Sequence, residues 1–262
     1  MTFSKIVRPT AFKPARETFI KTQPLSYCVI DNFVEPAIAE QLVAEFPSYT
    51  EESVWNGNYA NPLEIKKTCN IWDRFPQTTY SVLQYFQSPL FVSYLRYLTH
   101  EIELLVDPGL HGGGWHSHAR GGILNPHMDY DAHPKIPNFQ RRLNMILYLT
   151  PAWQETWGGH LGLFGNSTDA PYIEIAPLFN RAVIFITTDQ YHGISRPITC
   201  PSTVSRQSLA VYYGIPLTQE NRTRRRALFA PTKDQQDDPT IQDLIERRKD
   251  VTCDRVMDWS RI

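Results

Sequence analysis

Two potential metal ligands stand at alternate positions in the segment Asn125-Pro126-His127-Met128-Asp129-Tyr130. In an extended strand, side chains at i and i+2 point to the same face, so His127 and Asp129 are expected to project side by side into one cavity. A third ligand is predicted at His192, which follows the apolar run 182–186. Two imidazoles and one carboxylate hold a divalent metal and leave coordination positions open, so these residues predict a catalytic metal site.

Iron suits this ligand set better than zinc. Fe(II) bound in this way keeps three sites on one face free for a chelating cosubstrate and dioxygen. Zinc is more often held by His and Cys in a closed tetrahedron. The cysteines, at positions 28, 69, 200 and 253, are scattered and form no Cys-x-x-Cys pair, so they are interpreted as ordinary reduced thiols.

A carboxylate-binding pair is predicted 14 residues beyond His192. Arg206 and Ser208 stand at the start of an apolar strand and share one face of it. A guanidinium fork beside a hydroxyl binds a carboxylate through charge-assisted hydrogen bonds; a surface arginine at a strand end is the alternative. Tyr148 lies on the face of its strand opposite the apolar residues, where it either offers its hydroxyl to the same carboxylate or is a buried structural tyrosine.

The elements that must position these residues are short strands. From residue 103 onward, apolar runs are broken by Gly and Pro, and strands are predicted at 103–106, 114–119, 123–129, 143–150, 160–164, 172–175, 182–186 and 207–214. Eight short strands after a helical N-terminal third indicate a mainly β fold, a double-sheet jelly-roll barrel with the N-terminal helices packed outside.

The N-terminal third carries helical spacing. Helices are predicted at 36–46, 78–86 and 89–100, the last with Ser88 as its cap, after a short strand at 27–30. Residues 1–24, with three prolines, are interpreted as a surface arm or a loosely ordered segment, and residues 48–75 as mostly loop. We predict a single domain over 1–262: the arm and helical support at 1–100, the catalytic core at 101–216, and an extension with a helix at 217–262.

Charge and hydropathy exclude several classes of partner. Lys and Arg together number 26 against 27 Asp and Glu, which gives no general attraction to nucleic acid or anionic membrane. The basic runs 222–226 and 247–249 lack interleaved aromatic residues and are interpreted as solvated charged faces. Residues 1–24 contain no continuous apolar stretch, and no apolar run reaches membrane-spanning length, so a cytoplasmic location without nucleic-acid or membrane partners is predicted.

The functional residues form an ordered set: His127-x-Asp129, Leu147-Tyr148-Leu149-Thr150, Gly158-Gly159-x-Leu161, His192 and Arg206-x-Ser208. This set resembles the Fe(II)/2-oxoglutarate-dependent dioxygenases, and among them the prolyl 4-hydroxylase-like branch, over roughly residues 100–215. The resemblance implies a double-stranded β-helix, with Fe(II) on His127, Asp129 and His192. It also implies that Arg206 and Tyr148 bind the far carboxylate of 2-oxoglutarate, with Leu161 as an apolar wall and Ser208 as the partner of Arg206.

The reaction that this resemblance implies is the hydroxylation of an unactivated C–H bond, with dioxygen and 2-oxoglutarate as cosubstrates and succinate and carbon dioxide as products. Because Asp129 supplies a carboxylate where related halogenases need a vacant site, hydroxylation is favoured over halogenation. The loop between His192 and Arg206 is long for the family, so Arg196 stays an alternative carboxylate contact.

The substrate is predicted to be either a peptidyl proline or a small molecule. Trp115, His116 and Arg120 directly precede the ligand strand and are candidate substrate contacts, with Arg120 as a clamp for an anionic substrate. The segments 48–75 and 131–140 are the predicted lids. The competing hypothesis is a cupin-like metal-binding or ligand-binding module without turnover, which the fold alone permits.

Overall fold

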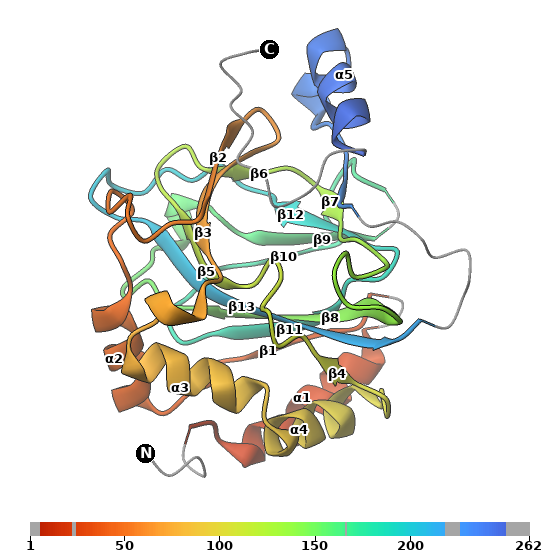
Figure 1. The fold of residues 1–262 in the computed structure, drawn as a ribbon. Coiled ribbons are helices and arrows are strands. Elements are labelled where there is room, and N and C mark those ends of the chain that lie inside the picture. Colours follow the sequence, from red (N-terminus) through yellow and green to blue (C-terminus); the bar gives the residue numbers. More distant parts are fainter. Residues whose placement is uncertain (1–5, 23–24, 166, 218–225, 250–262) are drawn as a thin grey trace.

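Two antiparallel sheets face one another and form the core of the computed structural model (Figure 1). The structure describes residues 6–22, 25–165, 167–217 and 226–249. The larger sheet has the strand order β1-β11-β8-β13-β5-β3-β2, with β4 paired to β13 and β6 to β3, and the smaller has the order β10-β9-β12-β7-β14. The predicted jelly-roll core with external helices is confirmed.

Most strands of the barrel lie close to their predicted positions. The larger sheet contains β1 (Tyr27–Ile30), β2 (Gly57–Asn61), β3 (Glu64–Cys69), β4 (Leu105–Val106), β5 (Gly114–His118), β6 (Ile123–Leu124), β8 (Phe139–Tyr148), β11 (Ala182–Ile186) and β13 (Arg206–Pro216). The smaller contains β7 (His127–Met128), β9 (Leu161–Gly165), β10 (Ile173–Ile175), β12 (Tyr191–Ile194) and β14 (Leu228–Phe229).

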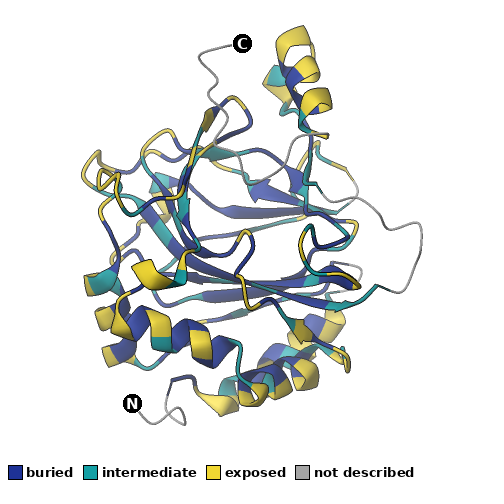
Figure 2. Ribbon diagram, in the orientation of Figure 1, coloured by how far each residue is buried: buried dark blue, intermediate teal, exposed yellow. Residues whose placement is uncertain are grey.

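Helices cover the outer face of the larger sheet (Figure 1). They are α1 (Phe12–Lys21), α2 (Pro36–Glu45), α3 (Gln77–Phe86) and α4 (Pro89–Thr99). The Ser88 hydroxyl accepts from the Phe91 amide, as the predicted cap requires. The apolar stripes of these helices pack with outward-facing sheet residues such as Met145, Ile184 and Val211, and their polar faces are exposed (Figure 2).

The segment 48–75, predicted as mostly loop, contains the hairpin β2–β3. Tyr59 lies opposite Lys66 in this hairpin, and β3 continues the larger sheet by pairing with β5. The prediction was wrong because the strands carry few apolar residues, so sequence alternation is weak where one face lines a polar cavity. The hairpin therefore forms a wall of the barrel rather than a structureless flap.

The N-terminal arm, predicted to lie on the surface or to be loosely ordered, contains helix α1. Its residues Phe12, Ala15 and Phe19 are buried at helical spacing, and the Phe12 ring stacks on Tyr94 of α4 at 5.1 Å. Pro14 lies in the first turn, where a backbone N–H has no intrahelical acceptor, so this proline does not break the helix. Reading Pro14 only as a helix breaker led to the wrong prediction.

A C-terminal segment, residues 226–249, returns to the smaller sheet and ends in α5 (Pro239–Arg248). Strand β14 pairs with β7, and Leu244 and Ile245 of α5 pack with Phe229 and Leu63. The predicted helix is present, and the Asp238 side chain caps it through the Thr240 amide. Residues 222–225 of the basic run 222–226 lie outside the described residues. Among the helices that the structure describes, none is long and apolar enough to span a membrane.

Candidate metal and cosubstrate site

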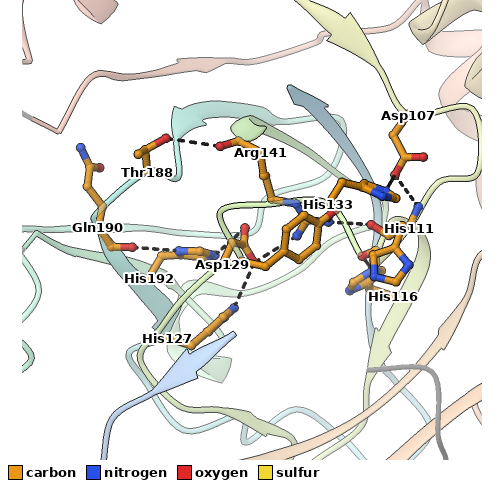
Figure 3. Close-up of polar contacts among 12 residues, drawn as sticks. Asp107, His111, His116, His127, Asp129, His133, Arg141, Thr188, Gln190 and His192 are labelled. Atoms are coloured by element: carbon orange, nitrogen blue, oxygen red, sulfur yellow. Dashed lines mark hydrogen bonds and ion pairs between the residues drawn. The ribbon is translucent and has the colours of Figure 1, made fainter. Parts of the chain in front are cut away.

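His127, Asp129 and His192 converge between the two sheets, although they come from two strands and a loop (Figure 3). Their ligand-type atoms all lie within 4.8 Å of one another. Asp129 lies between the imidazoles, with one oxygen 3.9 Å from His127 Nε2 and the other 3.7 Å from His192 Nε2. All three side chains are buried, and the pairing of His127 with His192 across β7 and β12 fixes their separation.

Both imidazoles are held in the form that a metal ligand needs. His127 Nδ1 donates to the Asn125 carbonyl at 3.0 Å, and His192 Nδ1 donates to the Gln190 carbonyl at 3.5 Å. Because a carbonyl oxygen only accepts, each ring carries its proton on Nδ1 and leaves the Nε2 lone pair facing Asp129. Burial, followed by His192, lowers the pKa of His127 to about 3, and burial also lowers the pKa of His192. The rings are therefore neutral near pH 7.

The ligand segment is not the continuous strand that the sequence suggested. Strand β6 ends at Leu124 in the larger sheet, and β7 begins at His127 in the smaller one. Asn125, which would share the ligand face in a continuous strand, instead donates to the Ala230 carbonyl at 3.2 Å. Pro126 lies where the chain crosses from one sheet to the other. Its backbone has no N–H to donate, but no strand pairing requires one at this position.

Arg141 holds the carboxylate of the triad. Its Nη1 lies 3.1 Å from Asp129 Oδ1, and its Nη2 donates to the His111 carbonyl at 2.6 Å and to the Tyr130 hydroxyl at 2.8 Å. The guanidinium carbon also lies 3.5 Å from the centroid of the Tyr212 ring. Burial raises the pKa of Asp129, but Arg141, His192 and His127 together outweigh burial and hold that pKa at about 2.

The sequence analysis gave Arg141 no role, and a β-bulge explains why. Asn144 and Ile146 line the cavity, so regular alternation along β8 would send Arg142 inward. The register with β13 shifts between Tyr213, which pairs with Leu143, and Gly214, which pairs with Arg141. The extra residue places Arg141 on the inner face. Arg142 instead pairs with Glu101 at 2.6 Å.

The predicted carboxylate anchor is assembled on three neighbouring strands. Arg206 of β13 is buried, donates from Nε to the Gly159 carbonyl at 2.7 Å, and donates from Nη2 to the Tyr148 hydroxyl at 3.2 Å. The Tyr148 oxygen accepts in that contact, so its own proton is left for a further acceptor. Arg206 lies opposite His118 of β5 in the sheet register, and His118 is only 1% exposed.

This anchor fits a bound carboxylate because it holds a buried charge without an anionic partner. Among the described residues, no carboxylate pairs with the Arg206 guanidinium, and neither ring nitrogen of His118 has a hydrogen-bond partner. An unpaired buried cation is costly, and an anion bound beside it removes most of that cost. His118, to which the sequence assigned no role in the anchor, adds a donor to the same place. The far carboxylate of 2-oxoglutarate would supply the anion that Arg206 lacks.

Some of the remaining residues predicted from the sequence line the cavity, and others lie outside it. Leu161, Ser208 and His116 line the same cavity as the triad and Arg206. Trp115 does not, because its side chain alternates outward between His116 and Gly114 and packs on Phe75 with ring centroids 4.9 Å apart.

Two arginines considered in the sequence analysis lie away from the cavity. Arg120 follows the end of β5, is exposed, and donates to the Cys200 and Thr199 carbonyls. Arg120 is not among the residues that line the cavity. Arg196, the alternative anchor, is half-exposed and pairs with Glu174 at 2.6 Å. The geometry leaves Arg206 as the arginine beside Tyr148.

Two walls of the cavity come from outside the predicted core. Tyr59, Glu64 and Lys66 of the β2–β3 hairpin line it from one side. Phe229 and Arg248 of the C-terminal segment line it from the other, and the Phe229 ring stacks on His127 with centroids 5.2 Å apart. The sequence held little signal for either wall, because each depends on pairing with a distant segment: β3 pairs with β5 about 50 residues away, and β14 pairs with β7 about 100 residues away.

Comparison with a family model agrees with this geometry. Residues 113–214 match the model of the 2OG-Fe(II) oxygenase superfamily, a span that runs from β5 to β13 and includes the triad and Arg206. Iron(II), 2-oxoglutarate and dioxygen are the cofactor and cosubstrates of that superfamily. No curated protein sequence matches the chain.

Solved structures share the fold at low sequence identity. A prolyl 4-hydroxylase of Pseudomonas putida is 18% identical, with a TM-score of 0.53, over 77% of this chain and 98% of that one. A prolyl 4-hydroxylase of Phytophthora capsici is 18% identical, with a TM-score of 0.53, over 95% of this chain and 77% of that one. A Trichoplax adhaerens prolyl hydroxylase, solved with a hypoxia-inducible-factor peptide, is 16% identical, with a TM-score of 0.52, over 79% and 91%.

Proposed function

We propose that this chain, whose residues 113–214 belong to the 2OG-Fe(II) oxygenase superfamily, hydroxylates an unactivated C–H bond of its substrate and releases succinate and carbon dioxide. One observation carries the proposal. Arg206, a buried arginine with no anionic partner among the described residues, lines the same cavity as a buried set of two histidines and one carboxylate. A metal site alone needs no such cation, whereas a dianionic chelating cosubstrate does.

His127, Asp129 and His192 are the proposed ligands. Bound iron(II) and 2-oxoglutarate would supply the electrons that reduce dioxygen and thereby activate it. The chain's own residues fix the geometry: the Nδ1 contacts orient both imidazoles, and Arg141 orients the Asp129 carboxylate. Arg206, Tyr148 and His118 hold the far carboxylate of the cosubstrate.

Burial is the second contribution of the protein. His127, Asp129 and His192 are each less than 8% exposed, and Phe229 covers one face of the His127 ring. Excluding water strengthens the polar contacts inside the site and protects reactive species from side reactions. The cupin-like alternative without turnover explains the ligand set but not the buried Arg206, which has no anionic partner in the part of the chain that the structure describes. We therefore favour the enzyme.

The test begins with anaerobic reconstitution of the full chain with Fe(II). Addition of 2-oxoglutarate is expected to give the weak visible charge-transfer band of the chelate, and admission of air is expected to produce succinate. A wild type without the band, or a band that survives the combined substitutions His127→Ala and His192→Ala, would reject the assignment. Arg247→Met, on the exposed face of α5, is the control for handling and expression.

A further inference from the structure

A cluster of three charged residues, the buried Glu64 and the partly buried Lys66 and Arg248, lines the cavity beside the metal ligands. We call it the mouth cluster. Lys66 Nζ lies 3.1 Å from Glu64 Oε2, and Arg248 Nη2 lies 2.5 Å from Glu64 Oε1. The side chains are 13%, 3% and 18% exposed for Lys66, Glu64 and Arg248 respectively, so these are enclosed charges and not a solvated surface pair.

The residues of the mouth cluster reach the cavity from two segments, strand β3 and the end of helix α5. Along β3, Glu64 and Lys66 line the cavity, whereas Ile65 between them is exposed on the other face. Lys67, the next residue, donates to the Tyr49 carbonyl. Arg248 arrives from the end of α5, where the sequence suggested a solvated basic run, and its guanidinium carbon lies 4.5 Å from the centroid of the Phe229 ring. The same Phe229 ring stacks on His127. The cluster therefore shares a wall with the ligand set.

The charges of the mouth cluster do not balance. One carboxylate faces two cations, and both of its oxygens are already engaged. An ammonium group has three donors and a guanidinium has five, while Glu64 is the one anionic partner of each cation among the described residues. The cluster thus carries one net positive charge and several unused donors. Arg206 and Arg141 do not supply this excess, since one is assigned to the cosubstrate and the other pairs with Asp129.

We propose that Lys66 and Arg248 bind an anionic group of the oxidised substrate, which is a small molecule bearing a carboxylate or a phosphate. This inference rests on the proposed function, because it describes the substrate of the same site. Glu64 is a positioning residue that holds the two cations apart at the cavity wall. A small molecule fits better than a peptide segment because the cations are enclosed between the β2–β3 hairpin and the C-terminal segment. Its anionic group lies at the mouth cluster and its reacting carbon toward the metal ligands.

Four probes that differ only in their head group test the inference: cyclohexanecarboxylate, cyclohexyl phosphate, cyclohexanecarboxamide and cyclohexylammonium. Each is titrated by calorimetry into the full chain loaded anaerobically with Fe(II) and saturating 2-oxoglutarate, so that the Arg206 anchor is filled and no turnover occurs. At least one of the two anions is expected to bind about tenfold or more tightly than the carboxamide, as expected for hydrogen bonds to a charged group. The stronger anion identifies the head group.

Substitutions then assign the preference to the mouth cluster. Lys66→Met and Arg248→Met are each expected to reduce the anion preference about tenfold, while Lys66→Arg retains it. Arg247→Met is the matched control, because it removes the same charge from the neighbouring residue, which faces solvent and pairs with Asp243. The head-group comparison uses only the wild-type protein, so it still tests the inference if a variant fails to fold.

Several results would overturn the inference: no saturable binding of either anion, equal binding of the carboxamide, or a preference for the ammonium, which would make Glu64 the recognition group. An anion preference that survives both Met substitutions would also overturn it. The wild-type chelate band separates this failure from that of the proposed function. If the band does not form, the function is wrong; if it forms without an anion preference, only the substrate class is wrong.

Discussion

Arg141 Nη1 lies 3.1 Å from Asp129 Oδ1, so the carboxylate of the triad enters the site already paired with a buried cation. This contact fixes the rotation of the carboxylate and keeps it ionised. Partners of this kind typically contribute 10- to 100-fold in metal affinity.

Substitution of Arg141 by Met is expected to weaken Fe(II) binding by about 10- to 100-fold, because Asp129 loses its orienting partner. The measurement is an anaerobic Fe(II) titration, accompanied by thermal melting to confirm folding. Arg142→Met is the matched control: Arg142 is adjacent in sequence, but pairs with Glu101 on the other face of the strand. Equal metal affinity in the two variants would contradict the assigned role.

The cosubstrate anchor gives a second prediction. Arg206→Met is expected to weaken 2-oxoglutarate binding by about 10- to 100-fold, since a charge-assisted contact is lost in a buried position, while Fe(II) binding changes little. Arg196→Met serves as the comparison because Arg196 is half-exposed and pairs with Glu174. If Arg196→Met, and not Arg206→Met, weakens the chelate band, the anchor has been assigned to the wrong arginine.

The Tyr148 hydroxyl gives a narrower test of the same anchor. Tyr148→Phe keeps the buried ring and removes one donor, so 2-oxoglutarate binding is expected to weaken by about tenfold. Tyr213→Phe is the control, since the Tyr213 hydroxyl donates to the Phe86 carbonyl at 2.9 Å on the helix side of the sheet. Calorimetric titration of 2-oxoglutarate compares the two. An unchanged affinity in Tyr148→Phe would show that the hydroxyl is structural.

Glu64 predicts a dependence of stability on pH. Burial would raise its pKa, but Lys66 and Arg248 outweigh burial and lower the pKa below its ordinary value of 4.5. A carboxyl group with a lowered pKa in the folded state stabilises the protein above its ordinary pKa, and this contribution is lost as the pH falls through the folded-state pKa. The unfolding free energy of the wild type should therefore fall more steeply below pH 4.5 than that of Glu64→Gln.

Urea unfolding at a series of pH values measures this difference. The variant is also expected to be less stable than the wild type near neutral pH, because Lys66 and Arg248 lose their shared anion. Parallel pH profiles for the two proteins would mean that the mouth cluster is solvated enough for its charges to contribute little.

The sequence by itself determined the chemistry of the site. The identities and order of His127, Asp129, His192 and Arg206 indicated the ligand set and the anchor, because few residue types bind a catalytic metal or a buried carboxylate. The apolar runs at β8, β11 and β13 indicated the barrel, since strands buried on both faces leave an uninterrupted signal. Helices α2, α3 and α4 followed from spacing and capping, which are local.

Tertiary structure decided which other residues lie beside the metal ligands and the carboxylate anchor. A one-residue bulge places Arg141, and not Arg142, on the inner face of β8. Strand alternation along β5 directs Trp115 away from the cavity and His118 into it. Glu64 and Arg248 meet across 184 residues of sequence, the difference between their positions, through a hairpin and a helix whose contact no local pattern encodes. The physical reason is that each strand shows one face to the cavity. Register between distant segments, rather than residue type, sets which face that is.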